Sequence, residues 1–241
     1  NKDYALTTNG TYTFTAGALN LITNITLSTG IFSSANINTR SIAFGTPSAA
    51  AYINLTHTTA ATTVLSMATL TGFSFTGVGG FTVADMANTR TFSVGNTAGG
   101  SATTAPSLTF TTGASVATLT TGSWFKDLSF FDTTFNPGTT ALNIAGNLQL
   151  GNGLYTTLSI TMRGSGWLQN RYNTITQAMA ALTINTTGTV SIYPGGYNWW
   201  CTTLTITAGA LDFTGSGGSI TCSSTVTYTA GTLTLTDGVM Y

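Results

Sequence analysis

Charged residues are scarce in this sequence. They make up 5% of the chain, with six Lys or Arg and six acidic residues, all of them Asp, so the net charge is zero at pH 7. A typical soluble domain has about 25% charged residues. Proteins that bind nucleic acid or an anionic membrane carry a basic patch or stripe, and this sequence has none. We therefore expect neither nucleic acid nor a membrane among its partners.

Long apolar runs, proline and helix-forming residues are also scarce. No apolar run approaches the ~18 residues of a membrane-spanning helix. Proline occurs only four times, and the 28 glycines have no period of three, which excludes collagen. Apolar residues still make up 42% of the chain, so a disordered chain is excluded too. Threonine, which disfavours helices, is close to a quarter of the residues. The composition leaves an all-β protein.

The dominant pattern is an apolar residue, a threonine and another apolar residue. Leu204-Thr205-Ile206 and Val226-Thr227-Tyr228 are two examples. Alternation with a period of two indicates half-buried strands. Gly, Asn and Ser recur between these runs, where turns need a permissive backbone. The sequence therefore predicts many short strands.

The strand phrases repeat at a regular interval. The phrase at residues 207–213 recurs about 22 positions later at residues 229–235, and the strand before it moves by the same interval. This period is the length of one coil of a parallel β-helix, whose short strands pair with their counterparts one coil away. We predict a right-handed parallel β-helix or a related β-solenoid as a single domain over residues 1–241. A β-sandwich or jelly-roll virion domain is the alternative.

The repeat weakens between residues 123 and 181, where aromatic residues accumulate. The turn signal Asn136-Pro137-Gly138 lies in this stretch. We expect less regular coils or a lateral loop here, within the same domain. Because the chain starts at Asn1 and ends within a repeat phrase at Tyr241, one interpretation is that it is a segment of a longer protein.

A second repeat contains arginine, which is rare in this chain. Residues 38–45, Asn-Thr-Arg-Ser-Ile-Ala-Phe-Gly, return at residues 88–95 as Asn-Thr-Arg-Thr-Phe-Ser-Val-Gly. A guanidinium group offers five hydrogen-bond donors in a fixed fork. We expect Arg40 and Arg90 to hold exposed carbonyl groups at the corners of coils.

Aromatic residues gather at two places and are the best candidates for a contact surface. Exposed rings near amides and hydroxyls stack on sugars, and Tyr and Trp are also enriched at subunit interfaces. Subunit packing, packing within the chain and glycan contact all remain open. The candidates are Trp124, Phe125, Tyr193, Tyr197, Trp199 and Trp200.

Catalysis has few residues to draw on. A glycosidase needs two carboxylates about 5 to 9.5 Å apart. The nearest pair in the sequence, Asp127 and Asp132, would lie on opposite faces of a continuous strand. His57 is the one histidine, and no nucleophile elbow is present. We expect no enzymatic activity and no cofactor.

Metal ligands are equally sparse. A calcium site would require Asp212 and Asp237 to meet on adjacent coils. Cys201 and Cys222 are either a disulfide or two buried thiols, and their inward positions in strand-like runs favour buried thiols. We expect no metal site.

The phrases at residues 33–45, 161–166 and 205–213 resemble the Thr/Gly-rich repeats of long structural proteins of aquatic tailed bacteriophages. The most specific of them contains Asn38-Thr39-Arg40-Ser41-Ile42-Ala43-Phe44-Gly45. The resemblance implies a virion fibre, a tailspike shaft or a surface decoration. It carries over no catalytic residues, because the shared phrases contain none.

We therefore expect a non-enzymatic structural protein on the surface of a phage-like virion: a fibre, spike shaft or capsid decoration. A homotrimer with other virion proteins as partners is favoured, and a host surface glycan is the candidate receptor for attachment. One alternative is a cell-surface adhesin or extracellular filament subunit. The other is a glycan-degrading tailspike, which predicts a groove with converging carboxylates.

Overall fold

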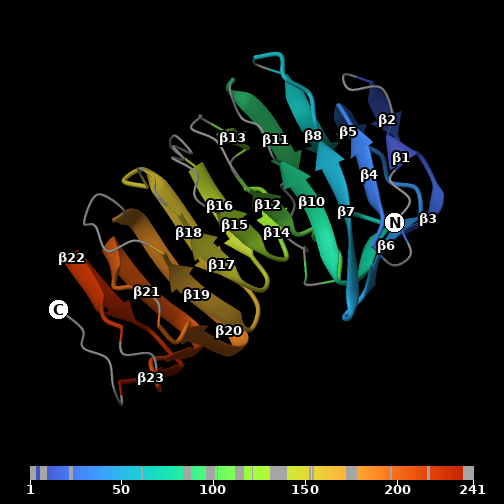
Figure 1. The fold of residues 1–241 in the computed structure, drawn as a ribbon. Coiled ribbons are helices and arrows are strands. Elements are labelled where there is room, and N and C mark those ends of the chain that lie inside the picture. Colours follow the sequence, from blue (N-terminus) through green and yellow to red (C-terminus); the bar gives the residue numbers. More distant parts are fainter. Residues whose placement is uncertain are drawn as a thin grey trace.

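The computed structural model shows strands stacked side by side along an elongated body (Figure 1). Strands and turns make up the described residues, with no helix among them. The all-β class is therefore confirmed. The structure describes residues 4–5, 10–21, 24–60, 62–83, 88–95, 101, 103–111, 117–120, 122–130, 140–151, 153, 155–171, 178–195, 197–215 and 218–235.

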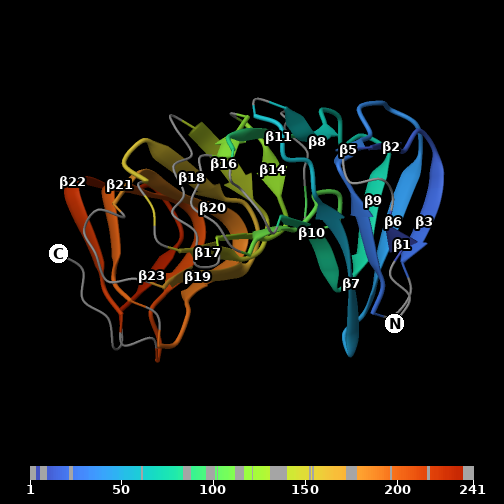
Figure 2. The same cartoon turned by 45° about the horizontal axis from the view of Figure 1, so that its top comes forward.

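One column of strands crosses the whole stack, and each of its strands pairs in parallel with the next. Figure 2 shows β21 and β22 at one end of the stack and β3 at the other. The members of this column are β1 (Tyr4–Ala5), β4 (Thr26–Thr29), β7 (Ala49–Leu55), β10 (Gly79–Val83), β12 (Leu108–Phe110), β15 (Leu128–Phe130), β17 (Leu148–Leu150), β19 (Gly166–Asn170), β20 (Met179–Ile192), β21 (Trp199–Asp212) and β23 (Thr232–Thr234).

Shorter columns complete the coils. A five-stranded sheet contains β2 (Thr11–Thr13), β5 (Ile31–Ser33), β8 (Thr63–Met67), β11 (Arg90–Val94) and β13 (Ala117–Leu119). Another parallel column contains β3 (Gly17–Leu21), β6 (Arg40–Thr46) and β9 (Phe73–Gly77). Towards the C-terminus a further column contains β14 (Trp124–Phe125), β16 (Thr140–Ile144), β18 (Leu158–Met162), the first halves of β20 and β21, and β22 (Ile220–Tyr228).

The pairing register gives the length of each coil. Ile53 pairs with Phe81, 28 residues on, whereas Leu211 pairs with Leu233, 22 residues on. The shortest coils step by 20 residues, through Leu108, Leu128, Leu148 and Leu168. The predicted β-solenoid with coils of about 22 residues is confirmed. Parallel ladders of this kind do not build a β-sandwich or jelly roll, whose sheets are antiparallel.

The inward side chains form continuous apolar rows along the axis. Alternation places every second residue of a strand inside, as in β18, where buried and half-buried residues alternate. Each fully buried Leu, Ile or Phe side chain contributes roughly 1.5–3 kcal/mol. One row is formed by Leu27, Ile53, Phe81, Leu108, Leu128, Leu148, Leu168 and Ile192, none of them more than 8% exposed.

The aromatic-rich stretch at residues 123–181 contributes β14 to β19 to the same stack. Its strands pair with the coils on either side at a constant 20-residue step. Residues 131–139 and 172–177, which include Asn136-Pro137-Gly138, lie outside the described residues.

The two arginine phrases lie in different columns. Arg40 begins β6, which pairs with β3 and β9, whereas Arg90 begins β11, which pairs with β8 and β13. Both side chains are buried, at 0% and 1% exposed. The Nη1 group of Arg90 donates to the carbonyl of His57.

Arg40 ties two coils together from inside the solenoid. Its guanidinium lies 4.4 Å from the ring centroid of Phe73, and burial lowers the pKa of the Arg40 side chain below its usual value. Its three nitrogens donate to backbone carbonyls on successive coils, those of Ser34, Asn38, Thr69 and Thr71.

We predict that Arg40→Met destabilises the protein by at least about 3 kcal/mol, because four carbonyls lose a charged donor. Equilibrium urea unfolding measures the loss. Arg163→Met is the matched control, since Arg163 is exposed and its Nε donates to a single partner, Asn143. We expect the control to change stability by less than about 1 kcal/mol. Equal effects of the two substitutions would contradict a structural role for Arg40.

Candidate functional site

Half of the six aromatic candidates lie in the core. Phe125 and Trp199 are 0% and 1% exposed, and Trp124 is 8% exposed. Phe125 pairs with Ile144 on the next coil, so its ring occupies an inward position of the strand. A glycan contact at these three rings is therefore wrong for this chain, and packing within the chain is what they do.

The other candidates remain accessible. Tyr193 and Tyr197 are 40% and 49% exposed, and Trp200 is half-buried. The amide of Tyr197 donates to the carbonyl of Asn170 and the amide of Tyr193 to the carbonyl of Leu168. These bonds fix the backbone of both tyrosines on the coil that follows β19.

Tyr193 packs against Trp167, a residue from the preceding coil. Their ring centroids are 5.1 Å apart with an interplanar angle of 59°. Trp167 pairs with Ser191, so Tyr193 stands diagonally across from it, within reach of an aromatic side chain. Trp167 is half-buried and lies on the outer face of β19. The two rings form an aromatic platform on the outside of the solenoid.

A row of polar side chains leads along the axis to this platform. The hydroxyl of Ser107 donates to Oδ2 of Asp127 at 2.9 Å, and the amide of Asn147 donates to Oδ1 of Asp127 at 2.8 Å. The amide of Trp167 in turn donates to Oδ1 of Asn147 at 3.1 Å. Each residue stands one 20-residue coil beyond the last, at the position before the inward leucine.

A second row runs two residues further along each strand. Ser129 donates to Oε1 of Gln149, whose Nε2 donates to Oε1 of Gln169 at 2.7 Å. Gln149 is 8% exposed and Gln169 is half-buried. Tyr193 follows next, because it comes directly after Ile192, the partner of Leu168. Amides and hydroxyls therefore border the aromatic platform.

We call these side chains the amide strip: Asn147, Gln149, Trp167, Gln169 and Tyr193. None of them is charged. Sequence reasoning named Tyr193 as a candidate but missed the other four. The available signal was the 20-residue recurrence of Asp127, Asn147 and Trp167, which the 22-residue repeat elsewhere obscured.

The described carboxylates are engaged with neutral donors. Asp127 accepts on both oxygens, as given above. Asp212 accepts from the hydroxyl and the amide of Thr214, which hold the pKa of that carboxyl below its usual value. The proposed partners Asp132 and Asp237 lie outside the described residues. Nδ1 of His57 accepts from the amide of Thr59.

No cluster of His, Cys or Asp suited to a metal ion occurs within the described part of the chain. Cys201 and Cys222 are free thiols, the first buried and the second half-buried. Their sulfur atoms face each other at 3.3 Å across adjacent coils.

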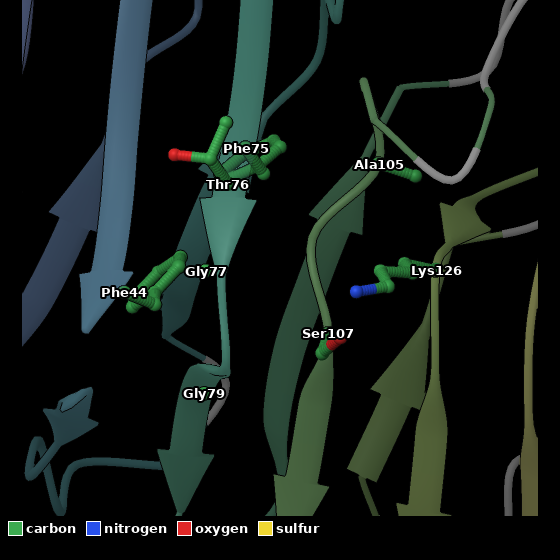
Figure 3. Close-up of a pocket in the computed structure, with 8 residues that line it drawn as sticks. All are labelled: Phe44, Phe75, Thr76, Gly77, Gly79, Ala105, Ser107 and Lys126. Atoms are coloured by element: carbon green, nitrogen blue, oxygen red, sulfur yellow. The ribbon is translucent and has the colours of Figure 1, made fainter. Parts of the chain in front are cut away.

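A pocket lies between the β9–β10 turn and the neighbouring coil (Figure 3). Its empty volume is about 230 Å³, part of which is open solvent. Phe44, Phe75 and Gly79 line one side, and Ser107 and Lys126 line the other. Lys126 is the one charged group in the lining, so the pocket offers no acid–base pair.

Among the described residues, no helix has the length and apolar character needed to cross a membrane. Comparisons with protein-family models, curated proteins and solved structures find no match.

We predict that Asp127→Asn lowers stability by less than about 1 kcal/mol, because the amide oxygen still accepts from Asn147 and the Ser107 hydroxyl can reorient. Asp127→Ala removes both acceptors and should cost about 1–3 kcal/mol. Thermal and urea unfolding compare the two variants, with the exposed Asp212→Ala as the control. A loss of glycan-cleaving activity in Asp127→Asn at unchanged stability would instead assign catalysis to this carboxylate.

Proposed function

We propose that this chain is a non-enzymatic structural protein of a phage-like virion, acting as a fibre, a spike shaft or a capsid decoration. The observation that carries the proposal is the unbroken parallel ladder from β1 to β23 over one apolar core. Such a stack is a stiff rod whose coils contact only their neighbours. The phage context rests on the sequence resemblance.

The surface composition supports a particle component that must persist outside cells. Outward positions carry Thr, Ser, Asn and Gln, and with 5% charged residues the chain has little electrostatic repulsion between copies. Low repulsion favours close packing of copies, in line with a homotrimer among other virion proteins.

The C-terminal coil offers a place for such packing. Val226 and Tyr228 pair with Leu204 and Ile206, whose side chains are fully buried. Val226 and Tyr228 are nevertheless 42% and 55% exposed. Covering these side chains would bury apolar surface, which favours contact with another chain.

The amide strip supports a part in attachment. Rings of Trp167 and Tyr193 beside the amides of Gln149 and Gln169 suit the apolar faces and hydroxyls of a sugar. Because the strip is uncharged, a neutral glycan fits better than an anionic one. Repetition of the strip in a trimer would strengthen individually weak contacts.

Two other functions remain as alternatives. The same rod would serve a cell-surface adhesin or an extracellular filament subunit. A glycan-degrading tailspike is less well supported, because both oxygens of Asp127 accept hydrogen bonds from neutral donors within the ladder.

Localisation tests the structural proposal. We expect antibodies raised against this chain to label phage-like particles in immunogold electron microscopy. Cryo-electron microscopy of those particles should show the rod in three-fold copies on the capsid or tail. Labelling of open filaments or cell surfaces without capsids would contradict the virion assignment and favour the adhesin.

Glycan binding tests the attachment part separately. We expect Trp167→Ala and Tyr193→Ala each to weaken binding to an array of neutral hexose and N-acetylhexosamine oligosaccharides by about tenfold. Tyr228→Ala is the matched control, since this tyrosine is exposed on the terminal coil, away from the strip. If wild-type protein binds no oligosaccharide on the array, attachment through the strip is wrong and the structural role stands on localisation alone.

A further inference from the structure

The two cysteines occupy matched positions on neighbouring coils. Cys201 in β21 pairs in register with Cys222 in β22. Their sulfur atoms are 3.3 Å apart, and the pairing shifts its register directly after Cys201. Cys201 is 1% exposed, whereas Cys222 is half-buried and accessible from outside.

This placement suits a disulfide. Paired strands lie about 4.8 Å apart, within the 4.4–6.8 Å between Cα atoms that a disulfide spans. The sulfur atoms must approach by a little over 1 Å to reach a bond of about 2.05 Å, which side-chain rotation supplies. No change of coil register is needed.

The two thiols differ in a way that divides the chemistry between them. Cys222 accepts a hydrogen bond from the thiol of Cys201, which lowers the pKa of Cys222. The same bond, together with burial, raises the pKa of Cys201. The accessible sulfur is therefore the one that ionises first, and the buried sulfur holds its proton.

We propose that Cys201 and Cys222 are a redox site that closes into a disulfide when the protein meets a small soluble disulfide such as oxidised glutathione. The Cys222 thiolate attacks one sulfur of the soluble disulfide, forming a mixed disulfide and expelling one thiolate. The Cys201 thiol gives its proton to that thiolate and attacks Cys222 Sγ, expelling the second. Two protein thiols are oxidised to one disulfide, and one soluble disulfide is reduced to two thiols.

The bond would clamp the coil that most needs it. The second half of β22, from Ser223 to Tyr228, is exposed, unlike the strands inside the stack. A covalent link between β21 and β22 limits how far this coil separates when the ladder opens. The site thus sets the stability of one end of the rod according to the redox state of its surroundings.

The test is to incubate the full chain with oxidised or reduced glutathione and map its peptides without reduction. We expect oxidation to remove both free thiols and to yield a linked Cys201–Cys222 peptide from a monomeric chain. Hydrogen exchange at the β22 amides should slow at least about tenfold in the oxidised form. At limiting iodoacetamide, reduced protein should be alkylated at Cys222 before Cys201, and at a lower pH than an ordinary thiol of pKa ~8.5.

Variants keep the result interpretable. Cys201→Ala should stop at the mixed disulfide on Cys222, and Cys222→Ser should leave Cys201 reduced and resistant to alkylation in the folded protein. Three outcomes would overturn the proposal: both thiols stay free in oxidised glutathione, wild-type Cys222 stays glutathionylated without an internal link, or the link forms between two chains.

Discussion

The backbone ladder that runs along the solenoid axis is the interaction on which everything else depends. Many strands here are only two to five residues long. Such strands are not stable alone, and each satisfies its backbone groups only by pairing with the coils on either side. Once that pairing is fixed, inward positions must be apolar and outward positions are free to vary. A chain rich in threonine and almost without charge meets this requirement.

The fold was predictable because alternation and repeat length are both written in the sequence. Leu204-Thr205-Ile206 and its counterpart 22 residues later have the spacing and pattern of adjacent rungs, and they pair as such. The individual coil lengths, from 20 to 28 residues, were not predictable. Thr, Ser and Gly occur in strands and turns alike, so an insertion in a turn leaves no mark in the composition.

The candidate site was harder, because it depends on which way each side chain faces. Clusters of aromatic residues in the sequence drew attention to Phe125 and Trp199, but strand alternation turns both rings inward. Trp167 and Tyr193 meet only because one coil brings residues 26 positions apart to the same face. The arginine phrases make the same point, since near-identical sequences begin strands in different columns at Arg40 and Arg90.

Side-chain bonding between the coils differs along the rod, and that has a mechanical consequence. Tension along the axis loads the coil interfaces in series, so the weakest interface sets the force at which the rod fails. Between β15 and β19 the Ser129, Gln149 and Gln169 bonds add side-chain links to the backbone ladder. Failure should therefore begin outside this central segment, and a pulled rod would unwind coil by coil from an end while its middle stays wound.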